Sequence, residues 1–182
     1  MSFSPHEPGR DGYGGSTRGQ DDTVGRLAPA VGRVLDGTEC RLPEGLPAER
    51  TLVVLAFRQR QQADVDRWIE LAVSLGVPAS PLAAPEPRAT AVVEVPVLGR
   101  RYLPARRFID GGMATSIRDP AVLARTITLY TDPVDYRRRC GITTADQVTA
   151  MLVDREGNVS FHALGPPGAG ATDELTTALG PV

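Results

Sequence analysis

Seven consecutive apolar or β-branched residues, 51–57, form the strongest feature of the hydrophobic pattern of this chain. A run without polar interruption is typical of a central strand that is covered on both faces of a sheet. Apolar side chains then recur every three or four positions between Val65 and Leu75, and Gly76 follows them. This spacing predicts a helix that ends at Gly76, so the first predicted unit is a strand followed by a helix.

Two further strands are predicted downstream of that helix. Residues 91–97 form the second, with Pro96 near its end or on a sheet edge, and residues 126–131 form the third. Asp-Pro pairs at 119–120 and 132–133 predict two helix starts, because aspartate caps a helix and proline fits its first turn. The later of these helices is expected to end at Gly141.

The last third of the chain predicts an antiparallel hairpin and a closing helix. Residues 149–153 and 159–163 are strand-like, and an acidic, glycine-containing turn joins them. Residues 172–179 form the predicted helix, with Thr172 as its N-cap. The order of elements predicts an α/β fold, a three-layer α/β/α sandwich around a mixed central sheet.

One folded domain accounts for most of the chain. Residues 1–22 contain two prolines and five glycines and are expected to be a disordered tail, so the domain is predicted to span residues 23–182, with an arginine-rich insertion near 99–120. A chain of 182 residues can bury about 70% of its unfolded surface without disulfides or metals.

Composition excludes several kinds of chemistry. All 20 basic residues are arginine, 22 residues are acidic, and the net charge is −2, so nucleic acid is not an expected partner. Without lysine there is no Schiff base and no P-loop. Two cysteines exclude a disulfide scaffold, no spacing suggests a metal site, and no cofactor is expected.

The expected location follows from what the hydrophobic pattern lacks. The N-terminal residues have no basic start followed by an apolar run, as a secretory signal would have. The longest apolar stretch, 52–57, is far shorter than the ~20 residues of a membrane span. A cytoplasmic protein without a membrane span is therefore expected.

Residues 46–179 resemble the thioredoxin-like superfamily. The last hairpin, 152–159, is similar to the final hairpin of that fold, and residues 129–142 are similar to a peroxiredoxin pattern. A closer resemblance, to the thioredoxin-like family of mitochondrial ATP synthase assembly factor ten and its bacterial look-alikes, rests on residues 107–113, Ile117, residues 126–127 and the hairpin. This resemblance implies an assembly-factor-like or chaperone-like role.

The redox residues that the superfamily resemblance implies are missing. Redox members place a cysteine at the start of the first helix, where the helix dipole lowers the thiol pKa. Here residues 58–62 are Arg-Gln-Arg-Gln-Gln. Redox members also have a cis-proline before the hairpin, and residues 147–150 contain no proline. The sequence thus predicts a redox-inactive domain with no catalytic residue, although an enzyme is not excluded.

The two cysteines leave alternatives open. Cys140 ends a predicted helix beside three arginines, and a buried packing role is favoured over a thiolate because a helix C-terminus disfavours negative charge. Cys40 could lie in an N-terminal strand, and the sequence does not decide whether the two thiols pair. His162 is expected to be an ordinary strand residue.

Arginines supply the candidate binding site. Several lie close together in the insertion, interleaved with Tyr102, Leu103 and Phe108, a composition that suits a carboxylate, a phosphate or an acidic partner segment. The alternative is a solvated surface whose arginines pair with acidic neighbours such as Asp110, Asp119 and Glu94. Two further arginines, at the start of the first helix, bind an anion or pair with Asp64 and Asp66. The candidate binding residues are Arg58, Arg60, Arg101, Arg106, Arg107, Asp110, Gly111, Gly112 and Met113.

Three functions are compatible with these features. The favoured hypothesis is a redox-inactive module that docks a protein partner through its arginine-rich loop. The alternatives are a thiol-dependent oxidoreductase or peroxidase-like enzyme that uses Cys140 or Cys40 at a non-standard position, and a binder of small anions. The partner and the oligomeric state are left open by the sequence.

Overall fold

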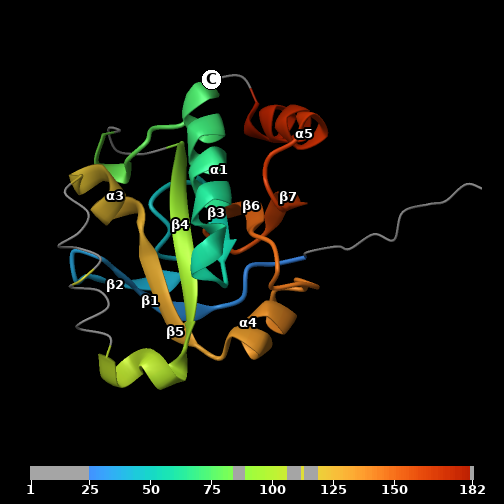
Figure 1. Cartoon of the computed structure of the whole chain (residues 1–182). Helices are drawn as coiled ribbons and strands as arrows, with labels where there is room; N and C mark the ends of the chain where they lie inside the picture. The colour runs from blue at the N-terminus through green and yellow to red at the C-terminus, as the bar shows by residue number, and fades with distance from the viewer. Residues whose placement is uncertain (1–24, 84–88, 106–111, 113–118, 181–182) are drawn as a thin grey trace, which may run out of the picture.

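The computed structural model describes residues 25–83, 89–105, 112 and 119–180 (Figure 1). Its centre is a seven-stranded sheet in the order β2-β1-β5-β4-β3-β6-β7. Strands β3, β4 and β5 run parallel to one another and all other neighbouring pairs are antiparallel. The strands are β1 (Ala30–Val34), β2 (Glu39–Leu42), β3 (Arg50–Ala56), β4 (Thr90–Gly99), β5 (Ile127–Thr131), β6 (Thr149–Asp154) and β7 (Val159–Leu164).

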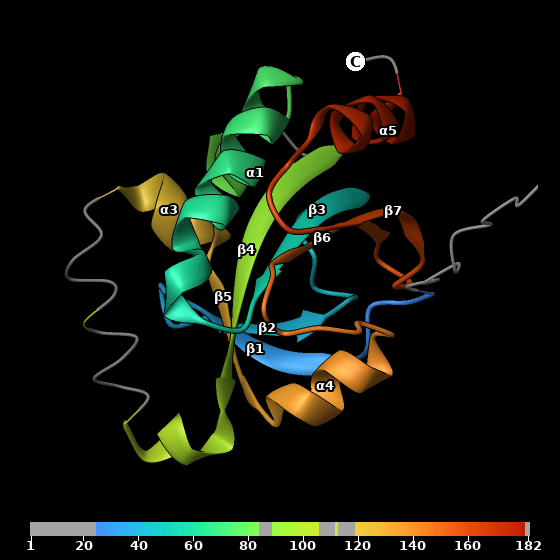
Figure 2. The same ribbon diagram turned by 45° about the vertical axis from the view of Figure 1, so that its right-hand side comes forward.

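Helices cover both faces of the sheet, which confirms the predicted α/β/α sandwich. Helices α1 (Gln62–Ser74) and α5 (Ala169–Leu179) lie on one face, and α4 (Pro133–Arg139) lies on the other (Figures 1 and 2). The short helix α3 (Pro120–Arg125) leads into β5. The described residues also form three 3-10 turns: η1 (Gln59–Gln61), η2 (Pro81–Ala83) and η3 (Arg100–Ala105).

The interior strand β3 contributes to two separate cores. Leu52 and Val54 face the core beneath α1 and α5, whereas Val53 and Leu55 face the core beneath α4. All four side chains are fully buried, as expected for a strand whose residues are apolar on both faces. In the α1 core the ring of Trp68 is also fully buried, and its Nε1 donates a 2.8 Å hydrogen bond to the carbonyl of the loop after β7.

The predicted helix starts at the two Asp-Pro pairs are confirmed. The Asp119 carboxylate accepts a hydrogen bond from the backbone of Ala121 at 2.8 Å and begins α3. The Asp132 carboxylate accepts two backbone hydrogen bonds at the start of α4, at 2.9 and 3.1 Å. Gly141 adopts φ +72° just after α4, a conformation that favours glycine and ends the helix where the sequence predicts.

Three local features differ from the prediction or are absent from it. The β1–β2 hairpin is not in the predicted list, although Cys40 lies in β2 as the sequence allowed. Pro96 lies opposite Ala56 at the end of β3, and since β4 is an interior strand, the edge alternative is wrong. Helix α5 begins at Ala169 after Gly168, so Thr172 is not its N-cap, and the threonine hydroxyl donates instead to the Gly168 carbonyl.

Candidate functional site

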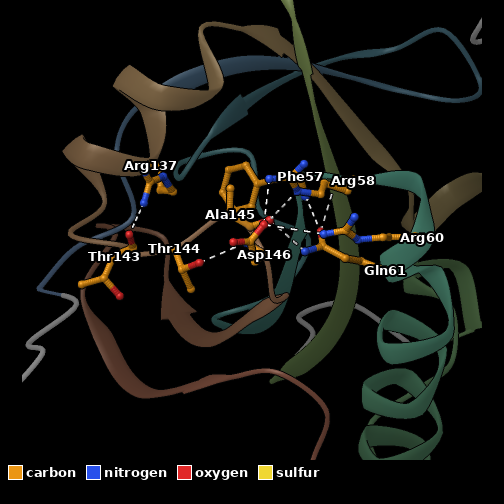
Figure 3. A network of polar contacts seen from close by, with 9 residues as sticks. All are labelled: Phe57, Arg58, Arg60, Gln61, Arg137, Thr143, Thr144, Ala145 and Asp146. Carbon is orange, nitrogen blue, oxygen red and sulfur yellow. Dashed lines mark hydrogen bonds and ion pairs between the residues drawn. The ribbon is translucent and has the colours of Figure 1, made fainter.

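The start of α1 and the loop before β6 meet at the carboxyl end of β3 (Figure 3). This meeting follows from topology: β6 runs antiparallel beside β3, with Leu55 opposite Thr149, so the residues after β3 face the residues before β6. The start of α1 is the place at which the superfamily resemblance expects a reactive thiol. Arginine and glutamine side chains occupy it.

Gln61 ties these two segments together. Its side chain is 3% exposed, and its Oε1 accepts hydrogen bonds from the backbone N–H groups of Phe57 and Arg58 at 2.8 and 3.0 Å. Its Nε2 donates to the carbonyl of Ala145 at 3.0 Å. One buried amide therefore satisfies two donors at the end of β3 and one acceptor in the opposite loop, which holds the loop against α1.

Asp146 lies against both arginines at the start of α1. Its Oδ1 is 2.7 Å from Nη2 of Arg58 and 3.6 Å from Nη2 of Arg60. The alternative of pairing with Asp64 and Asp66 is wrong for these arginines. Asp64 instead pairs with Arg67, and Asp66 accepts from Gln62, because these partners are three and four residues apart on α1.

The loop that carries Asp146 is also fixed from the α4 side. Arg137 donates to the carbonyl of Ile142 at 3.3 Å and to that of Thr143, and the hydroxyl of Thr144 accepts a hydrogen bond from the backbone of Asp146 at 3.1 Å. Residues 142–146 are thus bonded to α4 on one side and to Arg58 and Gln61, just before α1, on the other, and the loop holds the Asp146 carboxylate against the two arginines (Figure 3).

Neither cysteine lies at this site. Cys40 and Cys140 are unpaired and belong to the core beneath α4, where they are 7% and 1% exposed. Burial raises the pKa of both thiols, since the charged thiolate is poorly solvated there. Cys140 accepts a 3.4 Å hydrogen bond from the backbone of Ala28. The packing interpretation of Cys140 is therefore the one that the structure supports.

Of the predicted arginine-rich insertion near 99–120, the structure describes residues 99–105, 112, 119 and 120, and η3 is the main element among them. The Arg101 guanidinium lies 4.9 Å from the centre of the Tyr102 ring, and its Nη2 is 3.2 Å from the tyrosine hydroxyl. Gly112 is exposed. The other predicted residues of the insertion lie outside the described residues: Arg106, Arg107, Asp110, Gly111 and Met113.

Two acidic residues that the alternative assigns to these arginines have other contacts. Asp119 caps α3. Glu94 is 7% exposed in β4, where its carboxylate contacts the Thr126 hydroxyl and accepts a 3.2 Å hydrogen bond from Gln62. Over the residues with described positions, no group of three or more His, Cys, Asp and Glu side chains could hold a metal ion.

The sequence pattern made Arg58 and Arg60 candidates but did not point to Gln61 or Asp146, which contact them or the same loop in the structure. A signal for Gln61 exists, because a glutamine three residues after the start of a helical turn often accepts from the backbone there. The partnership of Asp146 has no local signal, since it lies more than 80 residues further along the chain.

No family model matches this chain, and no curated protein matches it. Solved structures do resemble it. BsSco, described as a member of the Sco family of cytochrome c oxidase assembly proteins with a disulfide switch, is 14% identical, with 85% of this chain and 91% of that chain covered and a TM-score of 0.52. A secreted thiol-disulfide isomerase from Corynebacterium glutamicum is 14% identical over 84% of each chain, with a TM-score of 0.52.

These similarities and the sheet topology define a thioredoxin-like fold, which confirms the predicted fold class. The closer resemblances, to ATP synthase assembly factor ten and to peroxiredoxins, stay predictions. The described helices include none that is both long and apolar enough to cross a membrane.

The predicted cytoplasmic location is contradicted by the same comparison. The similar structures include the isomerase from Corynebacterium glutamicum, which is described as secreted, and this neighbour points away from the cytoplasm. The physical reason for the error is that the sequence argument relied on the absence of a signal-like segment, and the folded domain itself carries no mark of its compartment.

Proposed function

We propose that this chain is a redox-inactive thioredoxin-fold protein that docks a partner protein through its arginines. The observation that carries the proposal is the occupation of the expected thiol position by Arg58, Gln61 and their contacts to the loop before β6. None of these side chains can form a thiolate, so the position cannot support thiol–disulfide exchange.

The docking arginines in this proposal come from two segments. Arg58 and Arg60 are exposed at the start of α1, and Arg101 is exposed on η3. Arg106 and Arg107 belong to the same insertion. Guanidinium groups on a rigid fold suit recognition of carboxylate or phosphate groups on a partner, because each group donates a planar fork of hydrogen bonds.

An assembly role has a precedent on this fold. BsSco is described as belonging to a family of cytochrome c oxidase assembly proteins. The resemblance to ATP synthase assembly factor ten leads in the same direction. We therefore propose that the docked partner is a protein undergoing assembly.

Redox inactivity is tested by measuring reduction of insulin disulfides and of hydrogen peroxide by the purified full chain. The proposal expects rates equal to those of buffer with reductant alone. Activity that disappears in Cys140→Ser or Cys40→Ser would instead establish the oxidoreductase alternative.

Docking is tested by cross-linking mass spectrometry of the tagged chain in its own cell, followed by capture with variants. Replacement of Arg101, Arg106 and Arg107 together by alanine is expected to abolish recovery of the cross-linked partner with little change in thermal stability. The matched control replaces two exposed arginines elsewhere, Arg41 and Arg155, and is expected to recover the partner normally. Equal recovery with both sets of variants would refute the proposal.

A further inference from the structure

The start of α1 and the turn η3 follow the carboxyl ends of two neighbouring parallel strands, β3 and β4. They therefore lie at the same edge of the sheet, the edge that these strand ends form. Ala56 near the end of β3 lies opposite Pro96 of β4, and β4 continues to Gly99, where η3 begins. The same arrangement is visible in both ribbon views, in which η3 and the lower end of α1 lie at the same end of the sheet (Figures 1 and 2). Side chains on these two segments can therefore contact one extended ligand.

This edge is positively charged although the whole chain carries a net charge of −2. Two exposed arginines, Arg58 and Arg60, begin the helix, and two more, Arg100 and Arg101, begin η3. On the neighbouring helix α4, Asp135 is already paired with Arg138 and Arg139 at 2.9 and 3.2 Å. Asp132, at the start of α4, is engaged as its N-cap.

Asp146 shows what the two helix-start arginines accept. A single carboxylate oxygen, Oδ1, contacts both guanidinium groups, and the side chain that carries it is 67% exposed. An exposed ion pair contributes about 0–1 kcal/mol, so an incoming carboxylate can take its place without a large cost. The Asp146 carboxylate thus occupies the position on these two arginines that a carboxylate of a bound ligand could take.

The turn η3 adds exposed apolar surface beside these charges. All of its residues are exposed, among them Tyr102 and Leu103 at 39% and 38%. The side chains of Tyr102 and Leu103 are thus not buried in either core, and the Arg101 guanidinium lies over the Tyr102 ring. Tyrosine and arginine together are the residue types that are enriched where protein partners are anchored.

We propose that this edge binds an acidic peptide segment that carries a large apolar side chain. Its carboxylates lie on Arg58 and Arg60 in place of Asp146, and its apolar side chain lies against Tyr102 and Leu103. The inference rests on the proposed function, because it assigns the chemistry of the partner to the docking surface proposed above. Charge complementarity selects an acidic segment over a basic one.

The test uses the full chain and fluorescence anisotropy of a fluorescein-labelled peptide of glutamates around a central phenylalanine. The same peptide with lysines in place of glutamates is the control probe. The glutamate peptide is expected to bind, with a Kd that rises with salt because the contacts are between exposed charges. Loss of both arginines in Arg58→Ala/Arg60→Ala is expected to weaken binding roughly tenfold or more.

Three further variants separate the parts of the surface. Tyr102→Ala/Leu103→Ala is expected to weaken binding several-fold. Asp146→Ala is expected to tighten binding roughly threefold, because the two arginines lose their internal competitor. Arg155→Ala is the charge-matched control and is expected to bind normally, since it lies in the turn after β6, beside the start of β3 at the opposite end of the sheet.

Arg60→Ala alone is the control for an effect on folding, because it leaves the contacts of Arg58 and Gln61 intact. This variant is expected to weaken binding several-fold with an unchanged thermal midpoint. The inference is overturned if the glutamate peptide does not bind, if the lysine peptide binds equally well, or if Arg155→Ala weakens binding as much as the double arginine variant. A dimer of this chain that disappears in Arg58→Ala/Arg60→Ala would also overturn it, because the surface would then bind a second copy.

Failure of this inference and failure of the proposed function give different results. If the glutamate peptide does not bind but capture of the partner still depends on Arg101, Arg106 and Arg107, the inference of an acidic segment is wrong. The proposed docking function is then still supported. If the chain reduces insulin through a cysteine, the proposed function is wrong whatever the peptide does.

Discussion

Gln61→Ala removes the side chain that joins β3, α1 and the loop before β6. Three hydrogen bonds are lost: two that Oε1 accepts from backbone N–H groups and one that Nε2 donates to the Ala145 carbonyl. Each bond of this kind contributes about 1 kcal/mol net, and the three partner groups are only partly buried, so the three contributions are summed without a further penalty for buried unsatisfied groups. The free energy of unfolding is therefore expected to fall by about 2–4 kcal/mol.

Urea unfolding of the full chain measures this loss, with Gln59→Ala as the matched control. Gln59 is exposed in the same turn, so its variant is expected to change the free energy of unfolding by less than about 0.5 kcal/mol. Gln61→Glu keeps an acceptor for the two backbone N–H groups and loses only the donation to Ala145, so an intermediate loss is expected.

Hydrogen exchange locates the effect. The amides of Phe57 and Arg58 are expected to exchange faster in Gln61→Ala, because they lose their acceptor. A loss below about 0.5 kcal/mol in Gln61→Ala, with unchanged exchange of these two amides, would refute the claim that Gln61 holds the site together.

Two further predictions concern the core beneath α4. In Gly32→Ala the added Cβ would lie 2.6 Å from Cγ2 of Ile127 and 2.8 Å from Cδ2 of Leu129, so urea unfolding should show a loss of about 1–3 kcal/mol, whereas Gly112→Ala, with no atom within 4 Å, should show no loss. Burial raises the pKa of the Cys140 thiol, so the unfolded chain releases this proton at lower pH than the folded chain and stability falls as pH rises above about 8.5. Cys140→Ala should make this alkaline loss smaller when urea midpoints are compared between neutral and alkaline pH; an identical loss in both proteins would contradict the assignment.

The fold could be predicted where a short stretch of sequence determines its own secondary structure. The run 51–57 is apolar at successive positions because β3 is buried on both faces, and the Asp-Pro pairs are self-contained helix starts. The β1–β2 hairpin is weaker in the sequence, since each strand has four or five residues and alternates buried with exposed side chains around Gly32 and Arg41. Its place in the sheet comes from pairing with β5, which lies about 95 residues away.

The candidate site was also predictable only in part, because some of its contacts join residues that are far apart in the sequence. Arg58 and Arg60 could be selected because residue type and position at a helix start indicate an anion site. Their carboxylate comes from Asp146, and only the antiparallel pairing of β3 with β6 brings that residue to them. Within α1, Asp64 pairs with Arg67, which is three residues away, and not with the arginines at the helix start.

The burial of both sulfur atoms has a consequence for the conditions under which this protein can work. Cys40 and Cys140 lie in the core beneath α4, with pKa values raised by burial, so the folded chain presents little thiolate to glutathione, oxidants or disulfide catalysts. Its structure contains no disulfide that a reducing compartment could break. The folded domain is therefore expected to have the same stability in oxidising and in reducing surroundings.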